Sequence, residues 1–237
     1  MSNIVIHKAN TRGSVDLGWL KSYQTFSFSG YYNPERMQFG ALRVLNDDIV
    51  NGGGGFGDHP HDNMEIISIP LEGALIHKDS MGNASTIYPG EIQVMSAGTG
   101  IYHTEYNQHE SDPAKFLQIW VYPNQRNVEP RYDQTIIKPA GDNVLYQILS
   151  PSADDEGVWI YQNAWFHMGT FTAGSEFSYE LKDTANGVYV FVIDGTLTVN
   201  GTELHKRDGM GTWEITNLQF VATSNAQLLI MEVPLKY

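Results

Sequence analysis

Two pairs of residues in the sequence have the types and the spacing of metal ligands. His59 and His61 lie in the segment DHPHDNME at residues 58–65, and His103 and Glu105 lie in AGTGIYHTEYN at residues 97–107. Side chains two residues apart on a β-strand point to the same face, so each pair could bind one cation. Three imidazoles and one carboxylate suit a divalent first-row transition metal and leave coordination positions open for a substrate.

A second carboxylate competes with Glu105 for the role of ligand. Glu65 has the same parity as His59 and His61, so an unbroken strand would direct all three side chains to one face. Spacing alone therefore leaves both Glu65 and Glu105 open as the carboxylate ligand. Asp58 and Asp62 have the opposite parity, and alternation directs them away from the histidines.

The other residues that could do chemistry lack partners. The remaining histidines show no HxH or HxE pattern, and we expect them to be structural or at the surface: His7, His77, His109, His167 and His205. The glycine run NGGGGFG at 51–57 lacks the Gly-Lys-Ser/Thr of a phosphate-binding loop, so we interpret it as a turn into the histidine strand. The chain has no cysteine, which excludes disulfides, thiolate nucleophiles and cysteine-based metal sites.

Short strands are the elements that must position these residues. Seven segments are rich in β-branched or aromatic residues and bounded by turn residues: 41–45, 65–71, 91–97, 116–122, 188–193, 196–200 and 227–233. No stretch shows an apolar period of 3.6 residues over three turns. Asp194-Gly195 and Asn200-Gly201 predict hairpin turns of type I′. The pattern predicts an all-β protein built as a sandwich or barrel.

A change in composition divides the chain into two halves. Residues 122–143 are polar and contain three prolines, and we interpret them as a connector. On either side, LEGALIHKDSMGNASTIYPGE and IDGTLTVNGTELHKRDGM share one order of strands and glycine turns, which predicts two copies of one β-barrel. We expect an N-terminal metal-binding domain over residues 1–130 and a C-terminal domain without metal ligands over residues 131–237.

Charge and hydropathy exclude two classes of partner. The 237-residue chain has a net charge of −13 and no basic cluster longer than HKR at 205–207, which argues against direct binding of nucleic acid. No transmembrane run and no signal peptide is visible, so we expect no membrane partner and a cytoplasmic location.

Four motifs in the first half make the sequence resemble a known family. They are TFSFSGYYNPERMQFGALRVLNDD, GFGDHPHDNMEI, LEGALIHKDSMGN and YPGEIQVMSAGTGIYHTEYN, and they resemble the pirin family of the cupin superfamily. The second half resembles the family more in layout than in residues. Two departures from the general cupin pattern are shared by pirins: seven residues separate Glu65 from Gly73, and the proline expected before His103 is absent.

The resemblance implies both a fold and a ligand set. Pirins have two tandem cupin-type (jelly-roll) β-barrels, and the family pattern assigns the metal to the N-terminal one through His59, His61, His103 and Glu105. Iron(II) is the first choice because mixed imidazole and carboxylate ligation with open positions suits non-haem iron, while nickel, copper, cobalt, manganese and zinc accept the same ligands.

The resemblance also implies a function. Some pirin-like proteins are quercetin 2,3-dioxygenase-like enzymes that cleave flavonols and release carbon monoxide. The expected partners are then a small aromatic substrate and dioxygen, with Glu105 accepting the proton of the 3-hydroxyl group. Independently of the resemblance, the position of Phe56 beside the glycine run and the histidine strand predicts that it lines the mouth of the metal cavity, where a flat aromatic substrate would stack. Other pirins are regulators that bind a transcription factor or an enzyme, with a structural or redox-sensing metal, and a third alternative is a metal-storing cupin. An open aromatic cavity would favour the enzyme. A monomer is the default expectation.

Overall fold

Twenty-two strands and one short helix account for the regular structure of residues 3–237, the part of the chain that the computed structural model describes. The helix is the single-turn 3-10 helix η1 (Ala9–Thr11). The all-β prediction is therefore confirmed. Over the same residues, no helix is long and apolar enough to cross a membrane.

The first barrel combines two antiparallel sheets. Its seven-stranded sheet has the order β12 (Arg131–Ile136), β9 (Glu91–Ser96), β6 (Glu65–Glu72), β11 (Ala114–Val121), β4 (Leu42–Val50), β3 (Leu20–Gln24) and β2 (Gly13–Asp16). Its four-stranded sheet has the order β5 (Gly55–His61), β10 (Ile101–Asn107), β7 (Leu75–Asp79) and β8 (Ala84–Ile87).

The second barrel repeats this plan. Its seven-stranded sheet has the order β1 (Ile4–His7), β20 (Gly209–Thr212), β17 (Asn186–Asp194), β22 (Ala226–Pro234), β15 (Trp165–Phe171), β13 (Tyr146–Ser150) and β14 (Val158–Trp159). Its four-stranded sheet has the order β16 (Glu176–Glu180), β21 (Asn217–Ala222), β18 (Thr196–Val199) and β19 (Thr202–His205). The repetition agrees with two tandem cupin-type barrels.

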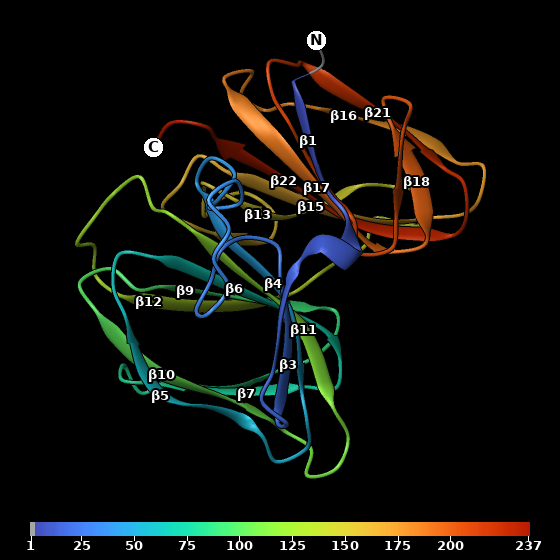
Figure 1. The fold of residues 1–237 in the computed structure, drawn as a ribbon. Coiled ribbons are helices and arrows are strands. Elements are labelled where there is room, and N and C mark those ends of the chain that lie inside the picture. The colour runs from blue at the N-terminus through green and yellow to red at the C-terminus, as the bar shows by residue number, and fades with distance from the viewer. Residues whose placement is uncertain (1–2) are drawn as a thin grey trace.

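Strand pairing crosses the predicted domain boundary in both directions. β12 lies inside the segment 122–143, where the composition predicted a connector, and pairs with β9 of the first barrel. β1 comes from the other end of the chain and pairs with β20 of the second barrel, where Figure 1 shows the blue strand among orange ones. The division into units 1–130 and 131–237 stays a prediction.

The two seven-stranded sheets face each other across one apolar core. Strands of the first barrel contribute Leu45, Ile67 and Ile119 to it, and strands of the second barrel contribute Phe166 and Leu229. Because a strand alternates its faces, the neighbours of these residues point into the barrels. The core shared by the barrels therefore determines which side chains line the interior of the first barrel.

The interior of the first barrel is apolar at both ends and polar in the middle. One end contains a cluster that includes Leu75 and Phe116, and the other contains a cluster that includes Ile66 and Met95. Buried polar residues lie between them: Asn46, Asp48, Ser68, His77, Gln93, His103, Glu105 and Gln118. Burying this many polar groups costs free energy unless they are paired or bind a ligand, which marks the middle of the barrel as a functional site.

One of the two predicted hairpins is wrong. Asn200 and Gly201, with φ of 47° and 79°, connect the paired strands β18 and β19 as a type I′ turn requires. At the other site only Gly195 has a positive φ, of 77°, and the strands on either side, β17 and β18, belong to different sheets. The Asp194-Gly195 turn leads the chain from one sheet to the other.

Candidate metal centre

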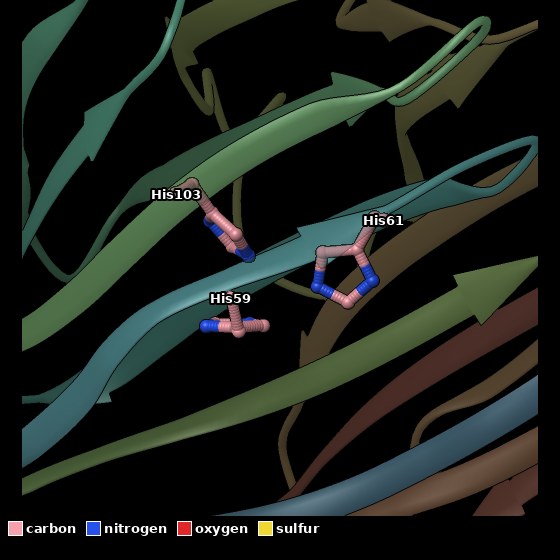
Figure 2. A group of neighbouring side chains, drawn as sticks. All are labelled: His59, His61 and His103. Carbon is pink, nitrogen blue, oxygen red and sulfur yellow. The ribbon is translucent and has the colours of Figure 1, made fainter.

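Three histidines from two neighbouring strands point into one space. β5 and β10 are antiparallel, and their register places His59 opposite His103. Their ring centroids are 4.4 Å apart, and that of His61 is 4.8 Å from His59 and 4.9 Å from His103. Figure 2 shows the three rings converging from the two strands. One ring nitrogen from each lies within 4.8 Å of the others, so the three side chains are within reach of one ion.

Glu105 lies beside this cluster and shares His103 with it. Its carboxylate, His77 and His103 form a second group whose ligand atoms lie within 4.8 Å of one another. Ser68 Oγ donates a hydrogen bond to Glu105 Oε1 at 3.0 Å, and Gln118 Nε2 donates to Oε2 at 2.9 Å. These donors hold the buried carboxylate in one orientation at the base of the histidine cluster.

Glu65 lies on the other side of the sheet. Asn63, with φ of 46°, turns the chain between β5 and β6, which belong to different sheets, so the parity of Glu65 with His59 does not persist. Glu65 points toward the core between the barrels, where Ser96 Oγ donates a hydrogen bond to its Oε2 at 2.6 Å. Burial raises the pKa of Glu65 to about 7. Of the two carboxylates that spacing left open, Glu105 is the one that faces the histidines.

The protonation of the histidines suits a cation. His59 Nδ1 donates a hydrogen bond of 2.8 Å to the carbonyl of Gly57, which leaves the lone pair of a neutral His59 on Nε2. Burial, followed by the neighbouring His59, lowers the pKa of His61 to about 4. Burial and the histidines around it lower the pKa of His103 to about 2, and its Nε2 is buried with no hydrogen-bond partner among the described residues. Neutral imidazoles with free lone pairs are the form that binds a metal.

A cavity of about 240 Å³ opens from the cluster. Part of its wall is aromatic: Phe28 packs edge-to-face on Trp120 with ring centroids 5.2 Å apart, and Trp120 packs edge-to-face on His61 at 4.9 Å. The lining residues are Phe28, Ser29, Asn46, Asp48, Phe56, His59, His61, Ile66, His103, Glu105, Gln118 and Trp120. The prediction that Phe56 lines this cavity is confirmed.

A row of polar side chains crosses the seven-stranded sheet beneath the histidines. Directly paired positions on β3, β4, β11, β6 and β9 carry Gln24, Asn46, Gln118, Ser68 and Gln93. The buried atoms Asn46 Oδ1 and Gln118 Oε1 have no hydrogen-bond partner within residues 3–237, and both residues line the cavity. The row therefore offers hydrogen-bonding groups to a bound molecule. It was not identified from the sequence because its members lie on five separate strands.

His77 was wrongly expected to have no partner. It is fully buried on β7, and the register between β7 and β10 pairs it with Glu105 and pairs Asp79 with His103. His77 and Asp79 repeat the spacing of two residues that marked the other ligand pairs, so HKD at 77–79 was the signal available in the sequence. Asp58 and Asp62 are exposed, as alternation predicted.

The second barrel has a different interior. Among residues 3–237 both groups of clustered ligand atoms lie in the first barrel. The corresponding space in the second barrel is filled by an apolar cluster that includes Phe171, Tyr179 and Phe220, with Phe177 packed against it. A second barrel without metal stays a prediction, and this packing supports it.

Comparisons with known proteins agree with this architecture. Residues 5–121 match the family model described as Pirin, and residues 147–233 match the one described as Quercetinase C-terminal cupin domain. A protein of Escherichia coli (strain K12) named quercetin 2,3-dioxygenase is 38% identical over 231 residues, 98% of this chain and 99% of its own length. A pirin-like protein of Caulobacter vibrioides is 37% identical over 93% of this chain and 95% of its own.

Solved structures give the same relationship. The crystal structure of the bacterial pirin YhhW from Escherichia coli in complex with nickel(II) has a TM-score of 0.92 at 37% identity and covers 98% of this chain and 99% of its own. A quercetin 2,3-dioxygenase from Acinetobacter baumannii shares the fold, with a TM-score of 0.82 at 20% identity over 99% of this chain and 87% of its own. The chain belongs to the pirin family.

Proposed function

We propose that this protein is a metal-dependent dioxygenase that cleaves flavonols such as quercetin. In this reaction quercetin and dioxygen give a depside and carbon monoxide, so both oxygen atoms enter the products and no further reductant is consumed. The observation that carries the proposal is the cavity, in which three imidazoles and a buried carboxylate face aromatic walls. The name of the Escherichia coli relative, which matches almost the whole chain, supports the same activity.

We assign the metal to His59, His61, His103 and Glu105. The free lone pair of His59 Nε2 and the unpartnered, buried His103 Nε2 fit such a site. When bound there, a divalent transition metal would bind the ionised 3-hydroxyl group of the substrate and assist its reaction with dioxygen. Iron(II) is our first choice, and nickel(II) is the second because a related pirin structure contains it.

Glu105 is the base in this proposal. Burial raises the pKa of its carboxyl group in the protein without metal. Ser68 and Gln118 each hold one of its oxygens, so the carboxylate keeps its orientation toward the cavity. Transfer of the 3-hydroxyl proton to Glu105 leaves the substrate as an enolate, which is electron-rich enough to react with dioxygen.

The walls and floor of the cavity suit a flat, hydroxylated substrate. The rings of Phe28, Phe56 and Trp120 offer apolar and edge-to-face contacts to an aromatic ring system. The unpartnered Asn46 Oδ1 and Gln118 Oε1 would accept hydrogen bonds from ring hydroxyl groups. An accessible cavity of this composition favours the enzyme over the alternative of a regulator with a purely structural metal.

Carbon monoxide release tests the proposal. The metal-free protein is reconstituted anaerobically with iron(II), mixed with quercetin under air, and compared with His59→Ala treated in the same way. We expect release by the first protein and none by the second. If no carbon monoxide forms with iron, nickel, copper, cobalt or manganese, although one metal is bound per chain, the flavonol proposal is wrong.

A further inference from the structure

A buried chain of side chains runs from β7 to the histidine cluster. Asp79 Oδ2 is 3.0 Å from His77 Nε2, and His77 Nδ1 is 3.4 Å from His103 Nδ1. The side chains of Asp79 and His77 have no exposed surface, and His103 is 1% exposed. Tyr132 stacks on His77 with ring centroids 4.7 Å apart, which covers the ring and fixes its plane. The direct ligands proposed above do not include His77 or Asp79.

The hydrogen bonds of Asp79 determine which atom donates and which accepts in this row of buried side chains. Its Oδ1 accepts the backbone N–H groups of Met81 and Asn83, each at 3.0 Å. Its Oδ2 accepts Asn83 Nδ2 at 2.9 Å as well as His77 Nε2. An ionised carboxylate only accepts hydrogen bonds, so the proton between Asp79 and His77 is on His77 Nε2.

The position of the proton on His77 in turn determines the position of the proton on His103. A neutral His77 that is protonated on Nε2 has its lone pair on Nδ1 and accepts a hydrogen bond there. The group facing it is His103 Nδ1, so a His77 with a single proton, on Nε2, accepts a hydrogen bond from a protonated His103 Nδ1. The lone pair of His103 is left on Nε2, the buried atom without a hydrogen-bond partner. For His59 the same result comes from a backbone carbonyl, that of Gly57.

We propose that Asp79 and His77 are positioning residues that hold His103 in the tautomer with an unprotonated Nε2 and so prepare the cluster for a divalent metal. Partners behind a metal-binding histidine fix its ring orientation and its tautomer in this way. The inference rests on the metal site of the proposed function, but it is independent of the substrate and of the reaction.

The tautomers can be measured directly in the metal-free protein. Long-range ¹H–¹⁵N correlation spectra of protein labelled in its histidines report which ring nitrogen carries the proton. We expect protonated Nε2 on His77 and protonated Nδ1 on both His103 and His59. Protonated Nε2 on His103, or two protons on His77, would overturn the proposal. Neither result depends on dioxygenase activity.

Asp79→Asn reverses the direction of the hydrogen bonds that connect Asp79, His77 and His103, while the side chain keeps nearly the same shape. The backbone N–H groups of Met81 and Asn83 need an acceptor, so the amide oxygen takes the place of Oδ1. The amide nitrogen then faces His77 and the Asn83 side chain, whose own amide turns to present its oxygen. That nitrogen donates to His77 Nε2, which moves the proton of His77 to Nδ1 and the proton of His103 to Nε2. We expect the affinity for nickel(II), measured by calorimetry, to fall by about 10–100-fold, with the tautomer of His59 unchanged.

Asn83→Ala is the matched control. It removes one donor to Asp79 Oδ2 but keeps the carboxylate and its bond to His77. We expect the tautomers to stay as in the wild type and the nickel(II) affinity to change less than about 3-fold, a difference well below the range for a lost positioning partner. An equal loss of affinity in both variants, or none in Asp79→Asn despite the reversed tautomers, would refute the positioning role.

Discussion

Glu105 faces the histidine cluster, whereas Glu65 faces the core between the barrels. Substituting each carboxylate in turn tests which of the two binds the metal. We expect Glu105→Gln to lower the affinity for nickel(II) by more than about 100-fold, because even loss of an outer partner of a ligand costs 10–100-fold. Glu65→Gln should leave the affinity unchanged, because Glu65 is bonded to Ser96 on the opposite face. Metal content per chain after dialysis measures both. Loss of metal in Glu65→Gln alone would show that the ligands are misassigned.

Glu65 should instead control stability as a function of pH. Its folded pKa of about 7 is above the value of 4.5 for an exposed glutamate, so folding takes up a proton between these values. The contribution of neutral Glu65 to stability is complete below pH 4.5 and is lost as the pH rises through 7. We expect this loss to be about 2 kcal/mol between pH 5 and pH 7.

The measurement is urea unfolding of the wild type and Glu65→Gln over that range of pH. A glutamine stays neutral, so the stability of the wild type relative to the variant should decline as the pH rises. A constant difference from pH 5 to pH 7 would mean that Glu65 is ionised in the folded protein, paired with the nearby Arg131.

At the scale of the strand, the contact between β5 and β10 keeps the ligands together. Gly55 lies opposite Tyr106, and a Cβ atom there would be 2.3 Å from the tyrosine ring and 2.6 Å from the carbonyl oxygen of Glu105. We therefore expect Gly55→Ala to push the strands apart, to reduce stability by about 1–3 kcal/mol, and to lower the nickel(II) affinity at least tenfold.

Gly57→Ala on the same strand is the control, since it keeps the backbone carbonyl to which His59 Nδ1 donates, and the one atom near its added Cβ is Tyr106 Oη at 3.8 Å. That variant should bind nickel(II) like the wild type. Thermal unfolding measures the stability of the two variants, and calorimetric titration measures their nickel(II) affinity. The comparison separates the effect of strand spacing from the effect of a stiffer glycine-rich segment. Equal behaviour of the two would contradict the role given to the strand contact.

Strand register also explains what the sequence could and could not predict. Spacing along one strand identified His59 with His61 and His103 with Glu105, because side chains two residues apart share a face whatever the neighbouring strand is. Contacts across strands depend on register, which no single segment reveals. For this reason the sequence could not show that His77 lies opposite Glu105, although its spacing from Asp79 was a signal along a single strand. Parity also failed for Glu65, where Asn63 turns the chain into another sheet.

On the scale of the whole molecule, an ion cluster joins the two barrels. Asp47 on β4 lies 3.0 Å from Arg207 Nε, between β19 and β20 of the second barrel, and 3.5 Å from an Arg12 guanidinium nitrogen. The Arg12 side chain is 4% exposed, and its Nε and other terminal nitrogen have no partner within residues 3–237. Asp47 is thus a buried negative charge that compensates two guanidinium groups at the edge of the shared core.

The shared core and this cluster predict that the barrels unfold together. Trp19 and Trp120 report on the first barrel and Trp165 reports on the second, whereas Trp159 and Trp213 lie against the first-barrel Arg131 and the shared core. A variant that keeps only the tryptophans of the first barrel should show the same urea midpoint as a variant that keeps only a tryptophan of the second barrel. Two separate midpoints would instead show that each barrel unfolds as an independent unit.

Asp47→Ala leaves the buried Arg12 without its partner, so we expect it to lower the free energy of unfolding by about 3 kcal/mol and to shift the midpoints of both barrels equally. Asp194→Ala removes an exposed ion pair of 2.8 Å with Lys206 and should cost less than about 1 kcal/mol. A loss confined to one barrel in Asp47→Ala would show that the cluster stabilises that barrel alone. An equal loss in both is the result expected if the first barrel, with its histidine cluster, and the second barrel unfold as one cooperative unit.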